Sequence, residues 1–404
     1  MKYLIFGYGV TGKSVEKYLS SKGEVYFIYD DDEKKLKNIE ESKLFVKNKI
    51  NEIDEVIISP GIIPNHELLQ EFITKRVSIK TDIDIFSNNY SGKIIGVTGT
   101  NGKTTFVNEL TKFLNLNMIP SIALGNIGVS PLDIIGKDYE YVVLELSSYQ
   151  LHYTTKLNLE IAVILNIFPD HIDWHEKFEN YVNSKLKILT FLDKEKEDRK
   201  IIGSNTGVIE NNLPKNSNLN SPINKNVHEE LLLSLGEAAK LVGGEDLFNS
   251  YIKYIEVNNI NYPHRMEQFL NLKNKNISFF NDSKATNYHA VSEATKLFSS
   301  QERDCILILH GITKETNKNE LNIDSIVNHI VIPKDMNINL GTNNANIIYI
   351  ENIYDIKVTL QNLLSNNQIV LFSCGGSSFN DFQNYQDRGN YFKKIVLSMD
   401  IEDA

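Results

Sequence analysis

The sequence predicts an α/β protein of three consecutive domains, spanning residues 1–91, 92–262 and 263–404. Two glycine-rich turns, at residues 7–12 and 99–105, each join an apolar, strand-like run to a helix-like segment. In the last third of the chain, polar residues again follow apolar runs, a pattern typical of the carboxyl ends of parallel strands. We therefore expect Rossmann-like first and third domains and a central domain of the P-loop, mononucleotide-binding type.

Composition restricts the class of partner. The 404 residues include 42 basic and 52 acidic side chains, which give a formal net charge of −10. This balance argues against nucleic acid or an anionic membrane as a general partner, so small anions must be bound by local features. The two cysteines provide no disulfide framework, and we find neither a signal-peptide pattern nor an apolar span of membrane length. We expect a cytoplasmic monomer that acts on small molecules.

The first domain opens with a βαβ pattern. It consists of a strand at Tyr3–Phe6, a turn at Gly7–Gly12, a helix to about Ser21 and a strand at Val25–Tyr29. A Gly-x-Gly-x-x-Gly turn followed by an acid, here Asp30, is typical of an NAD-dependent dehydrogenase. The same turn can bind any pyrophosphate, including that of a nucleotide sugar, so both interpretations stay open. Segments Val56–Ile62 and Ile79–Phe86 are expected to continue the alternation of strand and turn.

The second glycine-rich turn is a variant P-loop between the apolar pair Ile94-Ile95 and a helix-like segment at Phe106–Leu114. Val97 stands where the strict motif has glycine, so a chance glycine-rich turn is the alternative interpretation. Backbone N–H groups, a helix N-terminus, the Lys103 ammonium and the Thr104 hydroxyl are suited to phosphates and their metal ion. The predicted nucleotide-binding residues are Gly99, Thr100, Asn101, Gly102, Lys103, Thr104 and Thr105.

Two further segments of the central domain carry groups that can bind metal ions. Glu145 lies in the apolar run Tyr141–Ser148, where a buried acid needs a partner such as nucleotide-bound Mg²⁺. The alternative is an acid on an edge strand. The strand-like run Ile161–Ile167 leads into a loop, 168–175, with two histidines and two aspartates. This loop is either a metal site or ordinary loop chemistry.

Lys185 lies on the apolar stripe of the next predicted helix. The stripe consists of Phe178, Tyr181, Val182, Ile188, Leu189 and Leu192, at helical spacing. One interpretation is a lysine whose ammonium reaches past the core edge into water. The other is a desolvated amine with a lowered pKa, which would make it chemically usable.

The remaining chain is expected to contain a loop or poorly ordered segment at 205–226, a helix at Val227–Val242 and a domain boundary near Tyr262–Met266. Three polar segments then follow strand-like runs. They are Asn281–Asn287 after Ile277–Phe280, with a helix from about Tyr288 to Phe298; His310–Lys314 after Cys305–Leu309; and Ser373–Ser378 after Ile369–Phe372. Ligands bind at such strand ends in open α/β sheets.

Together these motifs resemble those of the Mur ligases, ATP-dependent amide-forming enzymes of peptidoglycan synthesis. The resemblance covers nearly the whole chain in the right order, and the run Asp282–Asn287 is similar to that of the branch that adds D-glutamate. The matching motifs are 9–12, 59–62, 99–105, 125–128, 144–148, 170–171, 181–185, 264–265, 282–287 and 388–389. The resemblance implies the substrates UDP-N-acetylmuramoyl-L-alanine, D-glutamate and ATP.

The resemblance also implies a role for individual residues. Around the UDP-sugar it places Gly9, Val10, Thr11, Gly12, Asp30, Ser59, Pro60 and Gly61. It assigns Lys103 to the ATP phosphates, with Asn126 near the phosphate and metal. One Mg²⁺ would be bound by Thr104 and Glu145. A second Mg²⁺ would be bound by His171 and a carbamylated Lys185. Asn224, Arg265 and Asp282 would bind the nucleotide, and Thr286, Lys314 and Ser378 the incoming D-glutamate.

The chain departs from the family pattern at three places. His310-Gly311 replaces the usual Gly-Gly, Cys374–Gly376 replaces Pro-Ala-Cys, and the adenine motif is reduced to Ile223-Asn224 with Val227 in the place of its second Asn. Three alternatives stay open, the last of them because of these departures. They are a sister ligase or folylpolyglutamate-synthase-like enzyme with another acceptor, the dehydrogenase, and a catalytically silent nucleotide-binding protein.

Overall fold

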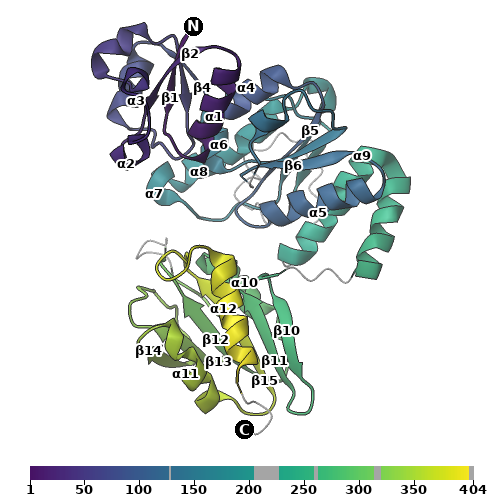
Figure 1. The fold of residues 1–404 in the computed structure, drawn as a ribbon. Coiled ribbons are helices and arrows are strands. Elements are labelled where there is room, and N and C mark those ends of the chain that lie inside the picture. Colours follow the sequence, from purple (N-terminus) through teal and green to yellow (C-terminus); the bar gives the residue numbers. More distant parts are fainter. Residues whose placement is uncertain (127–128, 204–226, 259–262, 314–319, 400–404) are drawn as a thin grey trace. The chain divides into compact units, whose positions relative to one another are not determined.

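The computed structural model describes residues 1–126, 129–203, 227–258, 263–313 and 320–399 (Figure 1). The chain forms two compact units, Met1–Tyr254 and Ile255–Ala404, with two sheets in the first unit and one in the second. The predicted α/β class is confirmed. The segment at 205–226, expected to be a loop, lies outside the described residues. None of the helices in the described ranges combines the length and the apolar character that crossing a membrane requires.

The first sheet is parallel, with the order β2-β1-β3-β4. Its strands are β1 (Lys2–Phe6), β2 (Val25–Tyr29), β3 (Glu55–Ile58) and β4 (Ser78–Lys80), and its helices are α1 (Val10–Ser21), α2 (Glu33–Leu36), α3 (Glu67–Thr74) and α4 (Asp82–Asn89). Because β2 and β3 flank β1, the turns after β1 and β3 lie side by side, as the bond from Ser59 Oγ to Gly7 O shows (2.7 Å). Gly12 packs against this turn so closely that a Cβ atom there would lie 2.1 Å from Gly7 O.

The segment 79–86 is not the strand and turn that the sequence suggested. Strand β4 ends at Lys80, and α4 begins at Asp82. Thr81 and Asp84 form a capping box, in which each side chain binds the backbone N–H of the other residue. This cap satisfies N–H groups at the helix start, so a helix forms despite the alternating isoleucines.

The second sheet is also parallel, with the order β6-β7-β5-β8-β9. Its strands are β5 (Lys93–Thr98), β6 (Ser121–Gly125), β7 (Tyr141–Glu145), β8 (Ile161–Ile164) and β9 (Lys200–Ile202). The helices are α5 (Lys103–Leu116), α6 (Ser148–Tyr153), α7 (Ile172–His175), α8 (Phe178–Leu186) and α9 (Val227–Asn258). The predicted helix along the apolar stripe is therefore shorter than expected, because a 3₁₀ helix at Lys187–Phe191 follows α8.

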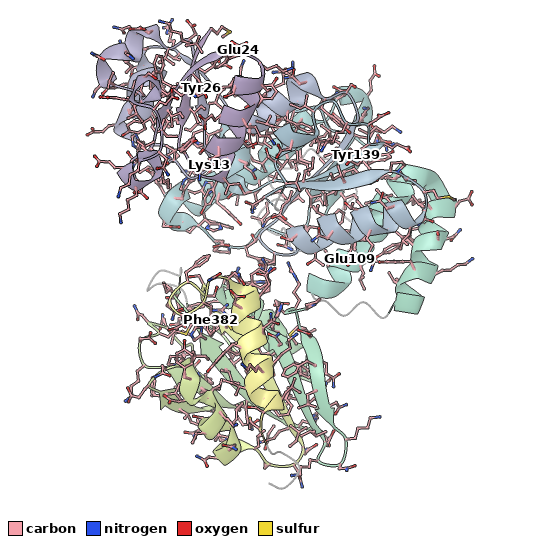
Figure 2. The ribbon with its side chains drawn as sticks, in the orientation of Figure 1. Lys13, Glu24, Tyr26, Glu109, Tyr139 and Phe382 are labelled. Carbon is pink, nitrogen blue, oxygen red and sulfur yellow. The ribbon has the colours of Figure 1, made fainter. Side chains whose placement is uncertain are left out.

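Helix α9 begins where the sequence predicted a helix and extends further, with a break at Gly243 and Gly244. Its second half packs on α5, where Tyr254 Oη donates a hydrogen bond to Glu109 Oε2 (3.0 Å; Glu109 is labelled in Figure 2). Phe113 of α5 and Tyr251 of α9 meet edge to face. One hydrogen bond and one aromatic contact thus hold the second half of the helix on α5, which explains why the helix is stable beyond its predicted end.

The second unit contains a six-stranded sheet with the order β10-β11-β15-β12-β13-β14, in which β10 alone is antiparallel to its neighbour. The strands are β10 (Glu267–Leu272), β11 (Ile277–Asp282), β12 (Asp304–His310), β13 (Val327–Pro333), β14 (Asn346–Ile350) and β15 (Gln368–Gly375). Helix α10 (Tyr288–Lys296) packs on one face, and α11 (Ile356–Leu363) and α12 (Tyr385–Leu397) pack on the other. Strands β11, β15 and β12 are neighbours and parallel, so the polar segments that follow them lie at the same, carboxyl-terminal end of the sheet.

Candidate active site

A cavity of about 1000 Å³ lies within the first unit, at the ends of strands from both sheets. Its lining from the first sheet includes Gly9, Val10, Thr11, Asp30, Ser59, Pro60 and Gly61. Its lining from the second sheet includes Thr100, Lys103, Asn126, His171 and Lys185. Gly7 and Lys185, at opposite ends of this part of the chain, thus share one cavity, and all of the predicted sugar-nucleotide residues except Gly12 line it. Of the seven predicted P-loop residues, Thr100 and Lys103 line it, whereas Gly99, Asn101, Gly102, Thr104 and Thr105 do not, and neither does Glu145.

At the first-sheet side of this cavity, Asp30 organises two loops. Its Oδ2 atom accepts a hydrogen bond from Tyr8 N (2.6 Å), and both of its oxygens accept from Lys35 Nζ (3.0 and 3.1 Å). Burial alone would raise the pKa of Asp30, but its backbone donors and Lys35 outweigh burial, so the pKa is lowered. Lys35 also lines the cavity, and no motif in the sequence marked it.

On the opposite side, the P-loop wraps around the start of α5. Gly102 has φ = 87°, a backbone conformation that favours glycine. Lys103 Nζ donates to Gly99 O (2.6 Å) and Thr100 O (2.9 Å), so its ammonium lies over the turn. The turn is braced from β8 by Asn166, whose Oδ1 accepts from Asn101 N (2.8 Å). Asn166 lies just after β8 and inside the run predicted as strand, and its polar side chain within that apolar run was its only signal in the sequence.

Glu145 ends strand β7, which lies between β6 and β5, so the edge-strand interpretation is wrong. Its side chain is 2% exposed. Oε1 accepts from Asn126 Nδ2 (3.3 Å), and Oε2 has no hydrogen-bond partner. A buried carboxylate oxygen without a partner is costly unless a cation binds it. Carboxylate and amide oxygens are suitable Mg²⁺ ligands, so Glu145 and Asn126 fit a magnesium ion.

Lys185 is buried inside α8 and does not reach water. Its side chain is 1% exposed, and Nζ donates to Gly99 O (2.8 Å) and lies 4.6 Å from the centre of the Tyr181 ring. Burial, and then the nearby Lys103 ammonium, lower the pKa of Lys185 well below its ordinary value. The interpretation of an ammonium that extends into solvent is therefore wrong, and the desolvated amine is confirmed. A neutral amine is the form that can react with CO₂ to give a carbamate, so the site fits that modification.

His171 is the only histidine of its loop that lines the large cavity within the described residues. It has φ = 56° at the start of α7, and Nδ1 lies 2.6 Å from Tyr149 Oη. His175 instead is bonded to Ser148 Oγ (3.0 Å). Across the described parts of the chain, no group of three or more His, Cys, Asp or Glu side chains is arranged to hold a metal ion. His171 and Lys185 both line the large cavity, so the two side chains open into the same space.

The predicted residues of the second unit gather at the ends of neighbouring strands. Asp282 ends β11, where it accepts from Ser373 Oγ (2.7 Å) and Met266 N (3.2 Å). Burial raises the pKa of Asp282 to about 7, although Ser373 and Arg265 oppose the shift. Thr286 follows β11, and the buried Ser378 follows β15, which pairs with β11. Lys314 and Asn224 lie outside the described residues.

Comparisons with known proteins extend this picture to the whole chain. Residues 1–81 match the family model described as Mur ligase MurD-like, N-terminal domain, and residues 97–279 match the Mur ligase middle domain. The UDP-N-acetylmuramoylalanine–D-glutamate ligase of Thermosipho africanus is 30% identical over 433 residues, covering 99% of both chains. The chain belongs to the Mur ligase family. A second such relative, from Thermosipho melanesiensis, is 29% identical over 99% of this Mur ligase and 98% of its own length.

Solved structures of other Mur ligases share this fold. The UDP-N-acetylmuramate-alanine ligase MurC of Thermotoga maritima has a TM-score of 0.53 at 14% identity and covers 99% of this Mur ligase and 100% of its own chain. MurF from Thermotoga maritima, solved in complex with ADP, has a TM-score of 0.53 at 12% identity, with coverage of 98% and 95%. At these identities the similarity establishes the α/β fold with parallel sheets.

Proposed function

We propose that this Mur ligase adds D-glutamate to UDP-N-acetylmuramoyl-L-alanine, with ATP as the energy source, in the synthesis of peptidoglycan precursors. The observation that carries the proposal is the single cavity shared by the first glycine turn, the P-loop and Lys185. A substrate whose nucleotide lies on the first turn can therefore present its far end to ATP phosphates on the P-loop. Relatives named for this activity match the chain over its whole length.

In this proposal the first-sheet side of the cavity binds the UDP-sugar. The residues involved are Gly9, Val10, Thr11, Asp30, Ser59, Pro60 and Gly61, with Gly12 supporting the turn. The helix α1 N-terminus faces the turn, which favours a pyrophosphate. Lys35 adds a cation at the same place, and Asp30 holds it there.

ATP is assigned to the P-loop residues 99–105, with Asn224, Arg265 and Asp282 as further nucleotide contacts. The ammonium of Lys103 would bind phosphate oxygens and offset charge that spreads over them during phosphoryl transfer. One Mg²⁺ would be held by Thr104 and Glu145 near Asn126, and a second by His171 and carbamylated Lys185. Bound there, Mg²⁺ neutralises phosphate charge and orients the γ-phosphate.

The reaction would proceed in two steps. The L-alanyl carboxylate attacks the γ-phosphorus of ATP, which forms an acyl phosphate and releases ADP. The amine of D-glutamate then attacks the acyl carbon through a tetrahedral intermediate, loses a proton and displaces phosphate. The protein contributes mainly by positioning the reactants and by neutralising charge. Thr286, Lys314 and Ser378 are assigned to D-glutamate because an ammonium and hydroxyls suit a dicarboxylate.

We propose the three sheets as three domains, with boundaries near residues 91 and 262, so that reactants bound on different domains meet on closure. An assay of phosphate release tests the function as a whole. It should require ATP, Mg²⁺, UDP-N-acetylmuramoyl-L-alanine and D-glutamate together. Preference for another acceptor would indicate a sister or folylpolyglutamate-synthase-like ligase. Absence of release with every acceptor would indicate a silent nucleotide-binding protein, and oxidation of a substrate by NAD would indicate a dehydrogenase.

A further inference from the structure

His310 is a buried histidine at the place where β12 ends, and the family pattern has glycine there. Its side chain is 1% exposed, and Nε2 lies 2.9 Å from Asp381 Oδ2. Its ring also packs on Phe382, with 5.7 Å between the ring centres; Figure 2 labels Phe382 in the second unit. Asp381 and Phe382 belong to the loop 376–384, which connects β15 to α12. His310 thus connects the end of β12 to the loop that follows the neighbouring strand β15.

The other side of His310 faces Arg388, which is fully buried at 0% exposure. Arg388 Nη1 donates to His310 O (3.0 Å) and Gly376 O (2.9 Å) and lies 3.5 Å from His310 Nδ1. Because the Asp381 carboxylate accepts hydrogen bonds, the 2.9 Å contact assigns the proton of the neutral ring to Nε2, and Nδ1 is then unprotonated towards Arg388. The Nε2–H group therefore donates to Asp381.

Burial and the Arg388 guanidinium keep the His310 ring neutral near pH 7. Burial, followed by Arg388, lowers the pKa of His310 to about 4, while Asp381 and Asp335 act in the opposite direction. A neutral ring with a fixed tautomer makes one directed hydrogen bond. Donor and acceptor are therefore fixed along the connection Arg388–His310–Asp381: the histidine receives from Arg388 and donates to Asp381.

The loop held by this connection carries Ser378, which is 3% exposed. At its start, Ser377 and Ile312 exchange two backbone hydrogen bonds, of 2.9 and 2.8 Å. Further along, Phe382 N donates to Ser378 O (2.9 Å), and Asp381 is bound by His310. Ser378 therefore lies between two anchors that both lead to the end of β12.

Space for this arrangement comes from a second departure. At Gly376 a Cβ atom would lie 2.7 Å from the Gly311 carbonyl carbon, so the loop can approach β12 only with glycine there. Arg388 Nη1 donates to the carbonyl oxygens of both His310 and Gly376, so these two positions take part in the same contact.

We propose that His310 and Asp381 form a positioning pair that fixes the loop bearing Ser378 and thereby sets the affinity for the incoming amino acid. This inference rests on the proposed function of Ser378. His310 does not react with the substrate. It acts through the loop, and Asp381 is its partner.

The test measures steady-state kinetics of the full-length protein. His310→Ala and Asp381→Ala should each raise KM for D-glutamate about five- to tenfold, with KM for ATP and for the UDP-sugar unchanged. This is less than the roughly 10- to 100-fold effect of one lost hydrogen bond to a charged group, because the pair acts on the substrate only through the loop. The double variant should be no worse than either single one, because both remove the same interaction. His310→Gln, which keeps a donor, should recover most of the affinity. Asn380→Ala, at an exposed neighbouring position, should match the parent.

Two outcomes would overturn the pair. One is an unchanged KM for D-glutamate in Asp381→Ala. The Asp381 side chain is 30% exposed and lies outside the core, so this variant should fold even if His310→Ala does not. The other is additive effects in the double variant. A readout independent of activity is the ¹⁵N spectrum of His310, which should show Nε2 protonated and Nδ1 unprotonated between pH 6 and 8. If the parent does not use D-glutamate, the proposed function fails, whereas the spectrum still decides whether the pair exists.

Discussion

The Nζ atom of Lys185 lies 2.8 Å from the carbonyl oxygen of Gly99, the first residue of the P-loop turn. Lys103 Nζ donates to the same oxygen at 2.6 Å. Two lysine amines thus converge on one carbonyl. Repulsion between two ammonium groups, together with burial, favours the neutral form of the more buried one, which is Lys185.

The first prediction concerns Lys185 as a carbamate. Lys185→Ala should lower amide formation by at least about 100-fold, because the carboxylate-like oxygens for Mg²⁺ would be lost. Formate or acetate at millimolar concentration should restore part of the activity by filling the vacated space. Phosphate release with and without formate is the measurement. Full activity of Lys185→Arg would contradict the carbamate, because a guanidinium cannot become one.

The second prediction concerns Glu145. Glu145→Gln should reduce turnover about 10- to 1000-fold and shift its Mg²⁺ dependence to higher concentration, because the orphaned buried oxygen is the one suited to the metal. Titration of activity against Mg²⁺ at fixed ATP measures the shift. Glu140→Gln is the matched control, since Glu140 is exposed just before the same strand. An unchanged Mg²⁺ dependence in Glu145→Gln would remove this residue from the metal site.

The third prediction concerns the nucleotide bound by the first turn. The full-length protein should bind UDP and not NAD, because the turn opens into the cavity shared with the P-loop. Lys35→Ala should weaken UDP binding about tenfold, the effect of removing one charge-assisted bond to phosphate. Calorimetric titration with UDP and NAD gives both affinities. Tight binding of NAD without binding of UDP would restore the dehydrogenase interpretation.

The fourth prediction uses the pH dependence of stability. Burial raises the pKa of Asp82 from 3.8 to about 6, and its Oδ1 atom has no hydrogen-bond partner. Folding therefore favours the protonated form, a contribution that is present below about pH 4 and is lost as the pH rises through about 6. Asp82→Asn should be more stable than the parent by roughly 1 to 3 kcal/mol at pH 7.5 and equal to it near pH 4. Urea unfolding at both pH values measures the difference, and an equal gain at both would contradict the titration.

The fifth prediction is a loss of stability when Asp84, two residues after Asp82, is replaced. Asp84 accepts hydrogen bonds from Thr81 in the cap of α4 and from Thr155 and Lys156 after α6, so it connects the two sheets of the first unit. Asp84→Asn replaces one carboxylate oxygen, which accepts hydrogen bonds, by an NH₂ group, which would face the donors of Thr81, Thr155 or Lys156. The free energy of unfolding should therefore fall by roughly 2 to 4 kcal/mol at pH 7.5. The same urea experiment tests it. A loss below about 0.5 kcal/mol would show that Asp84 is not an essential connection.

Much of the chemistry could be predicted from local patterns. The P-loop and the first glycine turn are short, continuous motifs whose glycines and lysine are fixed by backbone geometry, so a few consecutive residues identify them. Lys185 was identifiable because a charged residue on an apolar helix stripe is unusual. The prediction for segment 79–86 is wrong because its isoleucines alternate as in a strand, whereas the cap formed by Thr81 and Asp84 starts a helix there.

The sequence by itself therefore determined the α/β class, the glycine-rich turns and the residues that are unusual for their local pattern, because these depend on near neighbours in the chain. Only the tertiary structure decided between the two interpretations of Glu145 as an edge or central acid and of Lys185 as an exposed or buried amine. Glu145 is central because β7 pairs on both sides, Lys185 is buried because α8 packs over the P-loop, and His310 is bound because the loop after β15 folds back on β12. Burial and strand order are set by residues far apart in sequence, and no local pattern contains them.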